Sequence, residues 1–324
     1  MVRVAVLGCS LGLIIGCDDG ETADPAPVEP PWPPPPAAYL ASEAYDCSAT
    51  GPAEPPARPH ALDCFDDPSC SARLVTSHRI ATPFAPENSL SGLRAAILLG
   101  VDIVETDLRL TADGQVVIIH DDTVDRTLEG TGAVAQLTLA ELRSLPMRVL
   151  ATGPAGDFAC DRVPTLGELL ELAEGRIIVE LEVKDTEAGV LAAEILRDDG
   201  LAEGAFLLCD PGECDAIRGA VPEAAIMTRP ESADEVVEAV SYTPPPIMVH
   251  IDPFPTFLTE GVIDAIHGVD AKVCANAFLM ADIEALTAGR FAAYVEMYDG
   301  GLDVVQTEFP HWALTGLGRL TPSP

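Results

Sequence analysis

Short apolar segments that recur along the chain and end in polar residues are the feature that most constrains its fold. Eight of them have the length of strands, and they end near His78, Asp107, Lys184, Cys209, Met227, His250, Asn276 and Thr307. Helical stretches are predicted between them, for example over 90–99 and 166–173. Strands that alternate with helices pair in parallel, and eight such units close into a barrel. We therefore predict an α/β protein with a (β/α)8 TIM-barrel fold.

The segment after the second predicted strand departs from this repeat. Asp113-Gly114 is a turn signal, and residues 115–120 would return beside the second strand as the arm of a hairpin. If the hairpin is centred on that dipeptide, Asp107 and His120 lie opposite one another. A loop-rich insertion is expected to continue from the hairpin to about Pro164.

Charged residues gather at the ends of the second and third predicted strands. Glu105 and Asp107 stand two apart, as do Glu182 and Lys184, so each pair lies on one face of its strand. Neighbouring carboxylates raise one another's pKa unless a cation neutralises them, and carboxylate oxygens suit Mg²⁺ or Ca²⁺. An ordinary solvated strand end is the alternative for Glu105 and Asp107 taken alone. In a barrel, however, the carboxyl ends of the strands form the mouth where active sites lie.

A series of short motifs runs through the predicted barrel in a fixed order. They are His78-Arg79, Pro86-Glu87-Asn88-Ser89, Glu105-x-Asp107, Thr111-x-Asp113-Gly114, His120-Asp121, Arg126-Thr127, Glu182-x-Lys184, Val273-Cys274-Ala275-Asn276 and Gly301-Leu302-Asp303-Val304-Val305-Gln306-Thr307. In this order and spacing they resemble the glycerophosphodiester phosphodiesterase family, over roughly residues 74 to 318. The resemblance implies a metal-dependent phosphoric diester hydrolase on a barrel.

The resemblance also implies a role for each matching residue. The ligands of one divalent cation, Ca²⁺ or Mg²⁺, would be Glu105, Asp107 and Glu182. The groups that hold the phosphoryl oxygens would be Arg79 and Lys184, and the groups that exchange protons would be His78 and His120. The side chains expected to support them from behind are Glu87 and Asn88. The products would be sn-glycerol 3-phosphate and an alcohol.

Three positions depart from the family pattern. Ile80 stands where a glycine commonly follows His-Arg, Cys274 replaces a common tryptophan, and Glu308 stands where aspartate is frequent. Without a glycine at position 80, the backbone is expected to bend less freely and to approach a ligand less closely. None of the three removes a proposed ligand or proton carrier, so they bear on substrate choice.

Several other polar residues receive structural interpretations. Arg126 is expected to anchor the inserted loop. Glu180 would point the same way as Glu182 but one layer deeper, where a carboxylate needs a partner. His250 and Asp252 could line the mouth in a structural or substrate-shaping role. The histidines expected on the surface are His60, His267 and His311.

The N-terminal residues are predicted to be a leader. Residues 1–16 have the short apolar core of a lipoprotein signal peptide, and Cys17 would be lipidated. A proline-rich acidic tether (17–37) and a cysteine-containing lead-in (38–72) would precede the barrel domain (73–324). The expected location is the bacterial cell envelope, exported and lipid-anchored on the periplasmic or surface face. Simple cleavage of the leader, or a cryptic hydrophobic segment, is the alternative.

The cysteine count predicts disulfides and a free thiol. The cysteines that follow position 17 are Cys47, Cys64, Cys70, Cys160, Cys209, Cys214 and Cys274. Their odd number leaves at least one unpaired in an oxidising compartment. Cys274 is expected to be free because it lies in an apolar strand, and the first three suggest a small disulfide-stapled lead-in.

The formal net charge of −34 limits the partners. It argues against nucleic acid, whose phosphates would be repelled, and it opposes loose adsorption to anionic lipid. Membrane contact would therefore come through the lipid anchor. We expect a small-molecule substrate and no obligate protein partner.

Two other functions stay open on the sequence alone. One is a lipid-acting barrel enzyme of the phospholipase D or phosphatidylinositol phospholipase C kind, which also uses two histidines. The other is a non-catalytic surface lipoprotein that binds a ligand through a retired site. Retention of both histidines and all three carboxylates weighs against the second function.

Overall fold

A computed structural model describes most of the chain. The described residues are 33–57, 60–64, 67, 69–81, 83–149, 156–251 and 258–323. They belong to one compact unit, Trp32–Pro324, with its own hydrophobic core. The predicted signal peptide, Cys17, most of the predicted tether and Asp252 lie outside the described residues. No described helix combines the length and the apolar composition needed to cross a bilayer.

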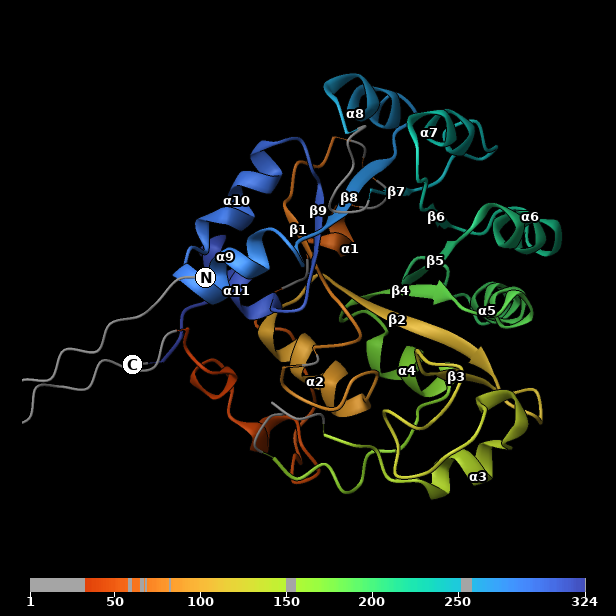
Figure 1. Ribbon diagram of the computed structural model, residues 1–324, viewed down its shortest axis with the longest axis vertical. Coiled ribbons are helices and arrows are strands. Elements are labelled where there is room, and N and C mark those ends of the chain that lie inside the picture. Colours follow the sequence, from red (N-terminus) through yellow and green to blue (C-terminus); the bar gives the residue numbers. More distant parts are fainter. Residues whose placement is uncertain are drawn as a thin grey trace, which may run out of the picture. The chain divides into compact units, whose positions relative to one another are not determined.

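Over the described residues, eight parallel strands close into a barrel (Figure 1). They are β1 Leu74–Ser77, β2 Ile103–Leu110, β4 Ile178–Val183, β5 Ala205–Cys209, β6 Ile226–Thr228, β7 Met248–Ile251, β8 Lys272–Asn276 and β9 Val304–Thr307. The ring closes because β1 pairs with both β9 and β2. Seven of the eight predicted strand ends lie within one residue of the observed ends, and β2 runs three residues past Asp107. The TIM-barrel prediction is confirmed.

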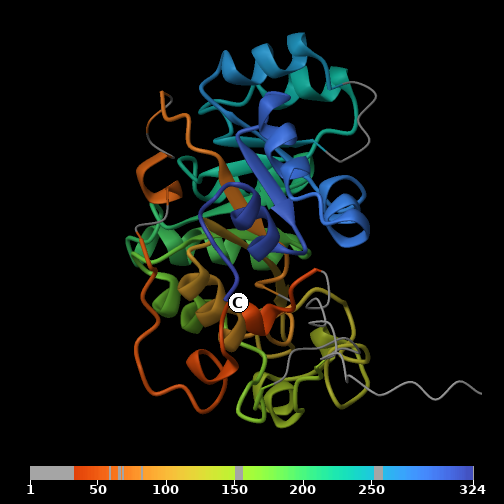
Figure 2. The same ribbon diagram turned by 90° about the vertical axis from the view of Figure 1, so that its left-hand side faces the viewer.

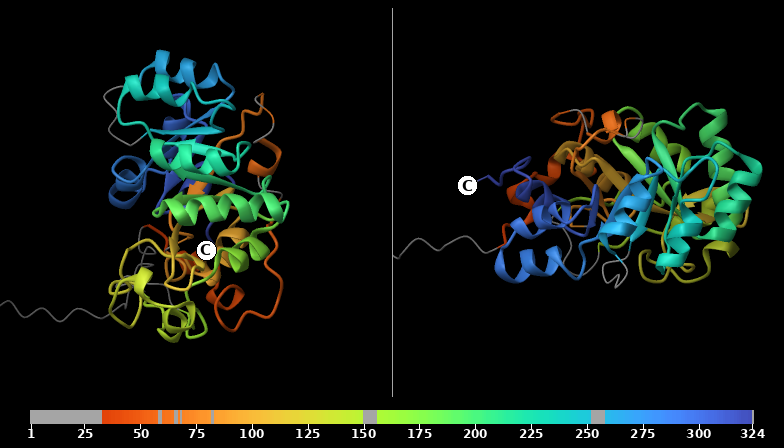
Figure 3. Two further views of the ribbon diagram at one scale, coloured as in Figure 1. Left: turned by 90° about the vertical axis from the view of Figure 1, so that its right-hand side faces the viewer. Right: turned by 90° about the horizontal axis from the view of Figure 1, so that it is seen from above.

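Helices connect the strands and cover the outside of the barrel. They are α2 Leu90–Leu99, α4 Leu166–Ala173, α5 Thr186–Asp198, α6 Pro211–Ala220, α7 Ala233–Ala239, α8 Glu260–His267, α9 Ala281–Ala288, α10 Ala292–Asp299 and α11 Pro310–Gly316. In this outer layer α5 packs beside α6 and α7 beside α8 (Figure 3). Hydroxyl caps set the helix starts: Ser89 accepts from the Gly92 N–H, and Thr165 accepts from the Glu168 N–H. The helices predicted over 90–99 and 166–173 are confirmed.

Alternation along the strands divides the side chains between two cores. The inner cluster of buried side chains is Ala61, Cys64, Leu74, Ile103, Ile178, Phe206, Leu208, Met227, Met248, Cys274 and Val304. Outward-facing neighbours such as Val75, Val104 and Val179 pack under the helices in a larger core. Five side chains of the inner cluster belong to the first residues of their strands, namely Leu74, Ile103, Ile178, Met248 and Val304. The amino end of the barrel is therefore filled with apolar groups. Polar inward-facing residues lie nearer the carboxyl ends.

The insertion after β2 is a hairpin followed by a small loop-rich layer with its own core. β3 (Val116–Ile118) pairs antiparallel with β2, and the short helices η3 (Val134–Gln136) and α3 (Leu139–Ser144) follow. The buried residues of this layer are Val117, Ile119, Val124, Leu128, Val134, Leu142 and Val163. The prediction of a hairpin and a loop-rich insertion is confirmed.

The lead-in runs along the outside of the barrel (Figure 2, red to orange). Its short helices are η1 Pro36–Ala38, η2 Ser42–Ala44 and α1 Ala61–Cys64. A disulfide joins Cys47 of the lead-in to Cys160 of the insertion, and a second joins Cys64 to Cys70. The lead-in is therefore stapled to the insertion as well as to itself.

The remaining cysteines behave as the count predicts. Cys209 at the end of β5 pairs with Cys214 on α6. Cys274 is buried inside the barrel and takes part in none of the disulfides among the described residues. This agrees with the prediction that Cys274 is the cysteine left out of the pairs.

The prediction that His311 lies on the surface is wrong. Its side chain is buried in the first turn of α11, edge-on to Tyr39 (4.9 Å between ring centroids) and to Phe84 (5.1 Å). Neither ring nitrogen has a hydrogen-bond partner among the described residues. Burial lowers the pKa of His311 to about 3, so the ring is neutral in the folded protein. His60 and His267 are exposed, as predicted.

We expect His311 to make the folded protein acid-sensitive. Because its pKa is about 3 when folded and near 6.5 when unfolded, the unfolded chain binds the extra proton between these values. Its contribution to stability is complete above pH 6.5 and is lost as the pH falls toward 3. Relative to His311→Phe, the free energy of unfolding should drop by about 2 kcal/mol between pH 7 and 5. Equal pH dependence of the two proteins in urea titrations would contradict this assignment, and His60→Gln is the exposed control.

Candidate active site

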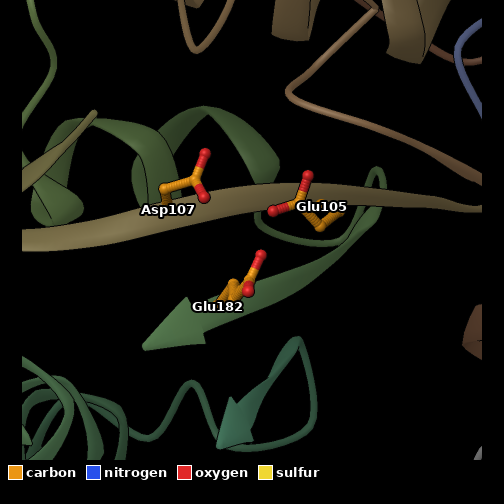
Figure 4. Close-up of side chains that lie close together, drawn as sticks. All are labelled: Glu105, Asp107 and Glu182. Carbon is orange, nitrogen blue, oxygen red and sulfur yellow. The ribbon is translucent and has the colours of Figure 1, made fainter. Parts of the chain in front are cut away.

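Three carboxylates meet inside the barrel toward the carboxyl ends of β2 and β4. Asp107 and Glu182 are register partners on these strands, and Glu105 lies one inward-facing position earlier on β2. One oxygen from each lies within 4.8 Å of the others, and all three residues are buried. Figure 4 shows the carboxylate of Glu182 turned toward β2, which carries the other two. The structure therefore brings together the three predicted metal ligands.

Glu105 is the most strongly perturbed carboxyl group of this cluster. Burial, and then the charge of Asp107, raise its pKa well above the usual value. The backbone N–H of Arg79 donates to Oε2 (2.8 Å), whereas Oε1 has no hydrogen-bond donor among the described residues. A buried carboxylate oxygen in this state requires a proton or a cation.

Glu182 carries its own cations. Lys184 Nζ lies 2.7 Å from Glu182 Oε1, and Arg229 Nη1 lies 3.0 Å from the same oxygen. Burial opposes ionisation of Glu182, but Lys184 and Arg229 outweigh it and lower the pKa to about 2. Lys184 Nζ also lies 3.4 Å from Asp107 Oδ1. The cluster is thus bordered by positive groups that an anion can meet.

The donor set fits one divalent cation. Three carboxylates on two rigid neighbouring strands supply the hard oxygen ligands that Ca²⁺ and Mg²⁺ prefer. Glu105 Oε1 lacks a donor, as a ligand oxygen does before it binds. A cation here would also remove the repulsion that raises the pKa of Glu105.

His78 faces the carboxylate cluster from the end of β1. Its Nε2 lies 3.9 Å from Glu105 Oε2, and its Nδ1 lies 2.8 Å from Glu308 Oε1. The ring also rests against Phe278, with 4.8 Å between the ring centroids. Glu308, which departs from the family pattern, therefore orients the imidazole from the side away from Glu105.

The chain after His78 turns sharply through three residues with left-handed backbone angles. The φ angles are +48° at Arg79, +58° at Ile80 and +46° at Ala81. Ser77 Oγ accepts from the Ala81 N–H (2.9 Å), and the Ile80 N–H donates to the Glu105 carbonyl (3.2 Å). The absence of a glycine at position 80 therefore does not prevent the bend. The bend forms with a buried isoleucine, and these local hydrogen bonds and side-chain burial hold it.

The prediction that Asp107 and His120 lie directly opposite is wrong by one residue. The backbone N–H of Ile119, not of His120, donates to the Asp107 carbonyl (3.0 Å). The hairpin is centred on Asp113 because its loop has three residues, with Gly114 at φ +75°. Three-residue hairpin loops need such a left-handed residue, and they shift the register by one position relative to a two-residue turn.

His120 nevertheless connects to the site through a chain of ion pairs. Its Nδ1 lies 2.7 Å from Asp121 Oδ1. Arg126 donates to Asp121 and, through both terminal nitrogens, to Glu87 (2.6 and 2.7 Å). The Arg126 hydrogen bond holds the pKa of Asp121 far below its usual value, so the partner of His120 stays ionised. Arg126 thus anchors the inserted loop.

Glu87 and Asn88 lie behind the predicted ligands. Glu87 is buried and lies 3.5 Å from Arg79, so it links the turn after β1 to the insertion. Asn88 Nδ2 donates to Asp107 Oδ2 (2.8 Å). Both residues therefore occupy the supporting positions that the sequence predicts.

Three residues near the site were missed in the sequence. Arg229 follows β6 and contacts Glu182, and Phe278 follows β8 and contacts His78. Asp282 is buried and accepts hydrogen bonds from the Thr307 hydroxyl (2.6 Å) and the Glu308 N–H (3.0 Å). Arg229 could have been found, since an arginine directly after a predicted strand lies at the mouth. Nothing in the local sequence marks Asp282.

Two inward residues lie deeper in the barrel. Glu180 is buried, and neither of its oxygens has a hydrogen-bond partner among the residues described here. Burial, and then the charge of Glu182, raise its pKa to about 8, so the group is largely a neutral acid at pH 7. His250 is buried on β7, at a register position beside Cys274. The sequence predicts a partner for the Glu180 carboxylate. Protonation of Glu180 takes the place of that partner.

We expect substitutions at Ile80 to reverse the usual order of stability. Ile80→Ala loses the buried side chain and keeps a Cβ at φ +58°, whereas Ile80→Gly loses the side chain but removes the backbone strain. Both variants should be destabilised, and the glycine variant should be the more stable by about 1 kcal/mol. Chemical denaturation checks the order. An alanine variant more stable than the glycine variant would show that the turn is not strained.

Comparison with known proteins agrees with this geometry. Residues 78–197 match the model of the glycerophosphoryl diester phosphodiesterase family. A curated glycerophosphodiester phosphodiesterase from Caldanaerobacter subterraneus subsp. tengcongensis is 40% identical over 112 residues, which are 34% of this chain and 45% of that protein. The chain thus spans about half the length of this relative and of a second curated relative from Bacillus subtilis.

Solved structures extend the similarity over the whole barrel. A glycerophosphoryl diester phosphodiesterase from Parabacteroides distasonis superposes with a TM-score of 0.65 at 23% identity, covering 81% of this chain and 92% of that one. An Oleispira antarctica phosphodiesterase, solved with its product sn-glycerol-3-phosphate, superposes with a TM-score of 0.61 at 25% identity, covering 76% and 96%. Over residues 78–197 this chain is therefore similar to the glycerophosphoryl diester phosphodiesterase family, and its barrel has the fold of these solved structures.

Proposed function

We propose that the protein hydrolyses glycerophosphodiesters to sn-glycerol 3-phosphate and an alcohol. The observation that carries the proposal is the meeting of Glu105, Asp107 and Glu182 within reach of His78. The Oleispira antarctica relative, solved with sn-glycerol-3-phosphate, supports the choice of substrate.

One divalent cation, Ca²⁺ or Mg²⁺, would be held by Glu105, Asp107 and Glu182. When bound, it would withdraw charge from the phosphoryl group and stabilise the crowded transition state. Arg79 and Lys184 would hold the phosphoryl oxygens. Lys184 Nζ lies beside the carboxylate cluster, where it can reach an anion bound there.

His78 and His120 would move the protons. The Glu308 carboxylate orients His78 through Nδ1 and leaves Nε2 on the side of Glu105. Asp121 orients the His120 ring through Nδ1. One histidine would take the proton of the attacking oxygen, which is a substrate hydroxyl or a water, and the other would protonate the leaving alkoxide.

We also propose that the protein is exported and lipid-anchored through Cys17. Three disulfides among the described residues support export, because disulfides persist in oxidising compartments.

We expect His78→Ala and His120→Ala each to lower kcat by about 10²–10⁴-fold, since each removes a proton carrier. The measurement is release of sn-glycerol 3-phosphate from glycerophosphocholine and other glycerophosphodiesters, with and without chelator. His267→Ala is the matched control: His267 is exposed and ends α8, which leads into the amino end of β8. No chelator-sensitive turnover by the folded protein with added Ca²⁺ or Mg²⁺ would sink the proposal.

Metal binding can be tested without turnover. Glu182→Gln should weaken Ca²⁺ or Mg²⁺ binding in calorimetry by at least about tenfold, because a ligand charge is lost. Glu187→Gln, an exposed residue of α5, is the control and should bind like the parent. Equal affinity of Glu182→Gln and the parent would remove Glu182 from the ligand set. Retained metal binding without hydrolysis would instead favour a non-catalytic binding protein.

A further inference from the structure

An uncharged apolar surface borders the mouth of the barrel on α9. Its members are Leu279, Met280, Ile283 and Leu286, which are between 43% and 58% exposed, and we call them the α9 patch. Ile283 and Leu286 lie one turn apart on α9, Leu279 and Met280 directly precede the helix, and Ala281, Asp282 and Ala285 are buried on its other side. Large aliphatic side chains concentrated in this way mark a surface that contacts another molecule or a membrane.

The absence of free charge on this face is unusual for such an acidic chain. The net charge is −34, yet none of the exposed positions 279, 280, 283 and 286–288 carries a charge. Asp282 is buried, and Glu284 is paired with Arg290 (2.5 Å). The Thr287 hydroxyl donates to the Ile283 carbonyl (2.6 Å) of its own helix. The face therefore offers few polar groups to which water can hydrogen-bond.

The patch is continuous with the proposed active site. Leu279 and Met280 directly follow Phe278, whose ring lies 4.8 Å from that of His78. Asp282, on the buried side of α9, holds the backbone of Glu308, which in turn contacts His78. A surface that covers the patch therefore lies at the edge of the catalytic mouth.

The described chain also begins at this end of the barrel. Tyr39, near the first described residue Pro33, packs against His311 in the first turn of α11. That turn follows the carboxyl end of β9, the end at which the site lies. The first described residues therefore lie at the same end of the barrel as the patch.

We propose that the α9 patch rests on a zwitterionic phospholipid surface and turns the mouth of the barrel toward the lipid headgroups. This deepens the proposed function and rests on it. Zwitterionic lipid is favoured because the patch is uncharged and the chain would be repelled by anionic lipid. A second copy of the chain is disfavoured, since two equally acidic molecules repel one another and would cover each other's mouths.

The test uses residues 32–324, so that neither the leader nor a lipid on Cys17 contributes to binding. This part contains the whole compact unit and its core, so we expect it to fold without residues 1–31. The protein is floated with phosphatidylcholine vesicles beside Leu279→Ser/Ile283→Ser. Val149→Ser/Val237→Ser is the matched control, because both valines are exposed but lie outside the patch.

We expect the parent and the control to bind the vesicles, and the patch variant to bind at least about tenfold more weakly, because large aliphatic groups no longer leave water. No binding by the parent, or equal binding by the patch variant, would overturn the proposal. If the parent and the control form a dimer and the patch variant is a monomer, the proposal is overturned as well. The patch would then be an interface with a second copy of the chain. Hydrolysis of soluble glycerophosphocholine, measured in parallel, reports on the proposed function separately.

Discussion

Burial of three carboxylates at the ends of two adjacent strands is the constraint on which the site depends. The three carboxylates repel one another, and burying them inside a barrel costs a large free energy unless hydrogen-bond donors and cations surround them. The surroundings come from many elements: the turn after β1 gives the Arg79 N–H, the start of α2 is preceded by Asn88, and β6 leads to Arg229. The unusual turn and the tethered insertion both serve to bring these groups to the cluster.

The fold was predictable because the repeat of strands and helices appears in the pattern of hydrophobic residues along the chain. Parallel strands buried on both faces read as apolar runs, and seven of their ends could be placed within one residue. The carboxylate cluster was predictable for a related reason. Period-two alternation puts Glu105 and Asp107 on one face, and parallel register then places Glu182 beside them.

What the sequence could not supply depends on tertiary contacts. The hairpin register turned on whether the loop has two or three residues, which the dipeptide Asp113-Gly114 does not reveal. His311 reads as a helix-end residue, but Tyr39, which is 272 positions earlier in the chain, covers it. Asp282 orients Glu308 from another helix. For His311 and Glu308 the deciding partner is far away in sequence.

The Cys47–Cys160 bond has a consequence for biogenesis. Its two cysteines are 113 residues apart, and the pair encloses Cys64 and Cys70. Cys64 and Cys70, which are 6 residues apart, can pair with each other early, whereas Cys47 must wait for Cys160. The insertion that carries His120 is therefore clamped to the lead-in only after residue 160 has been synthesised.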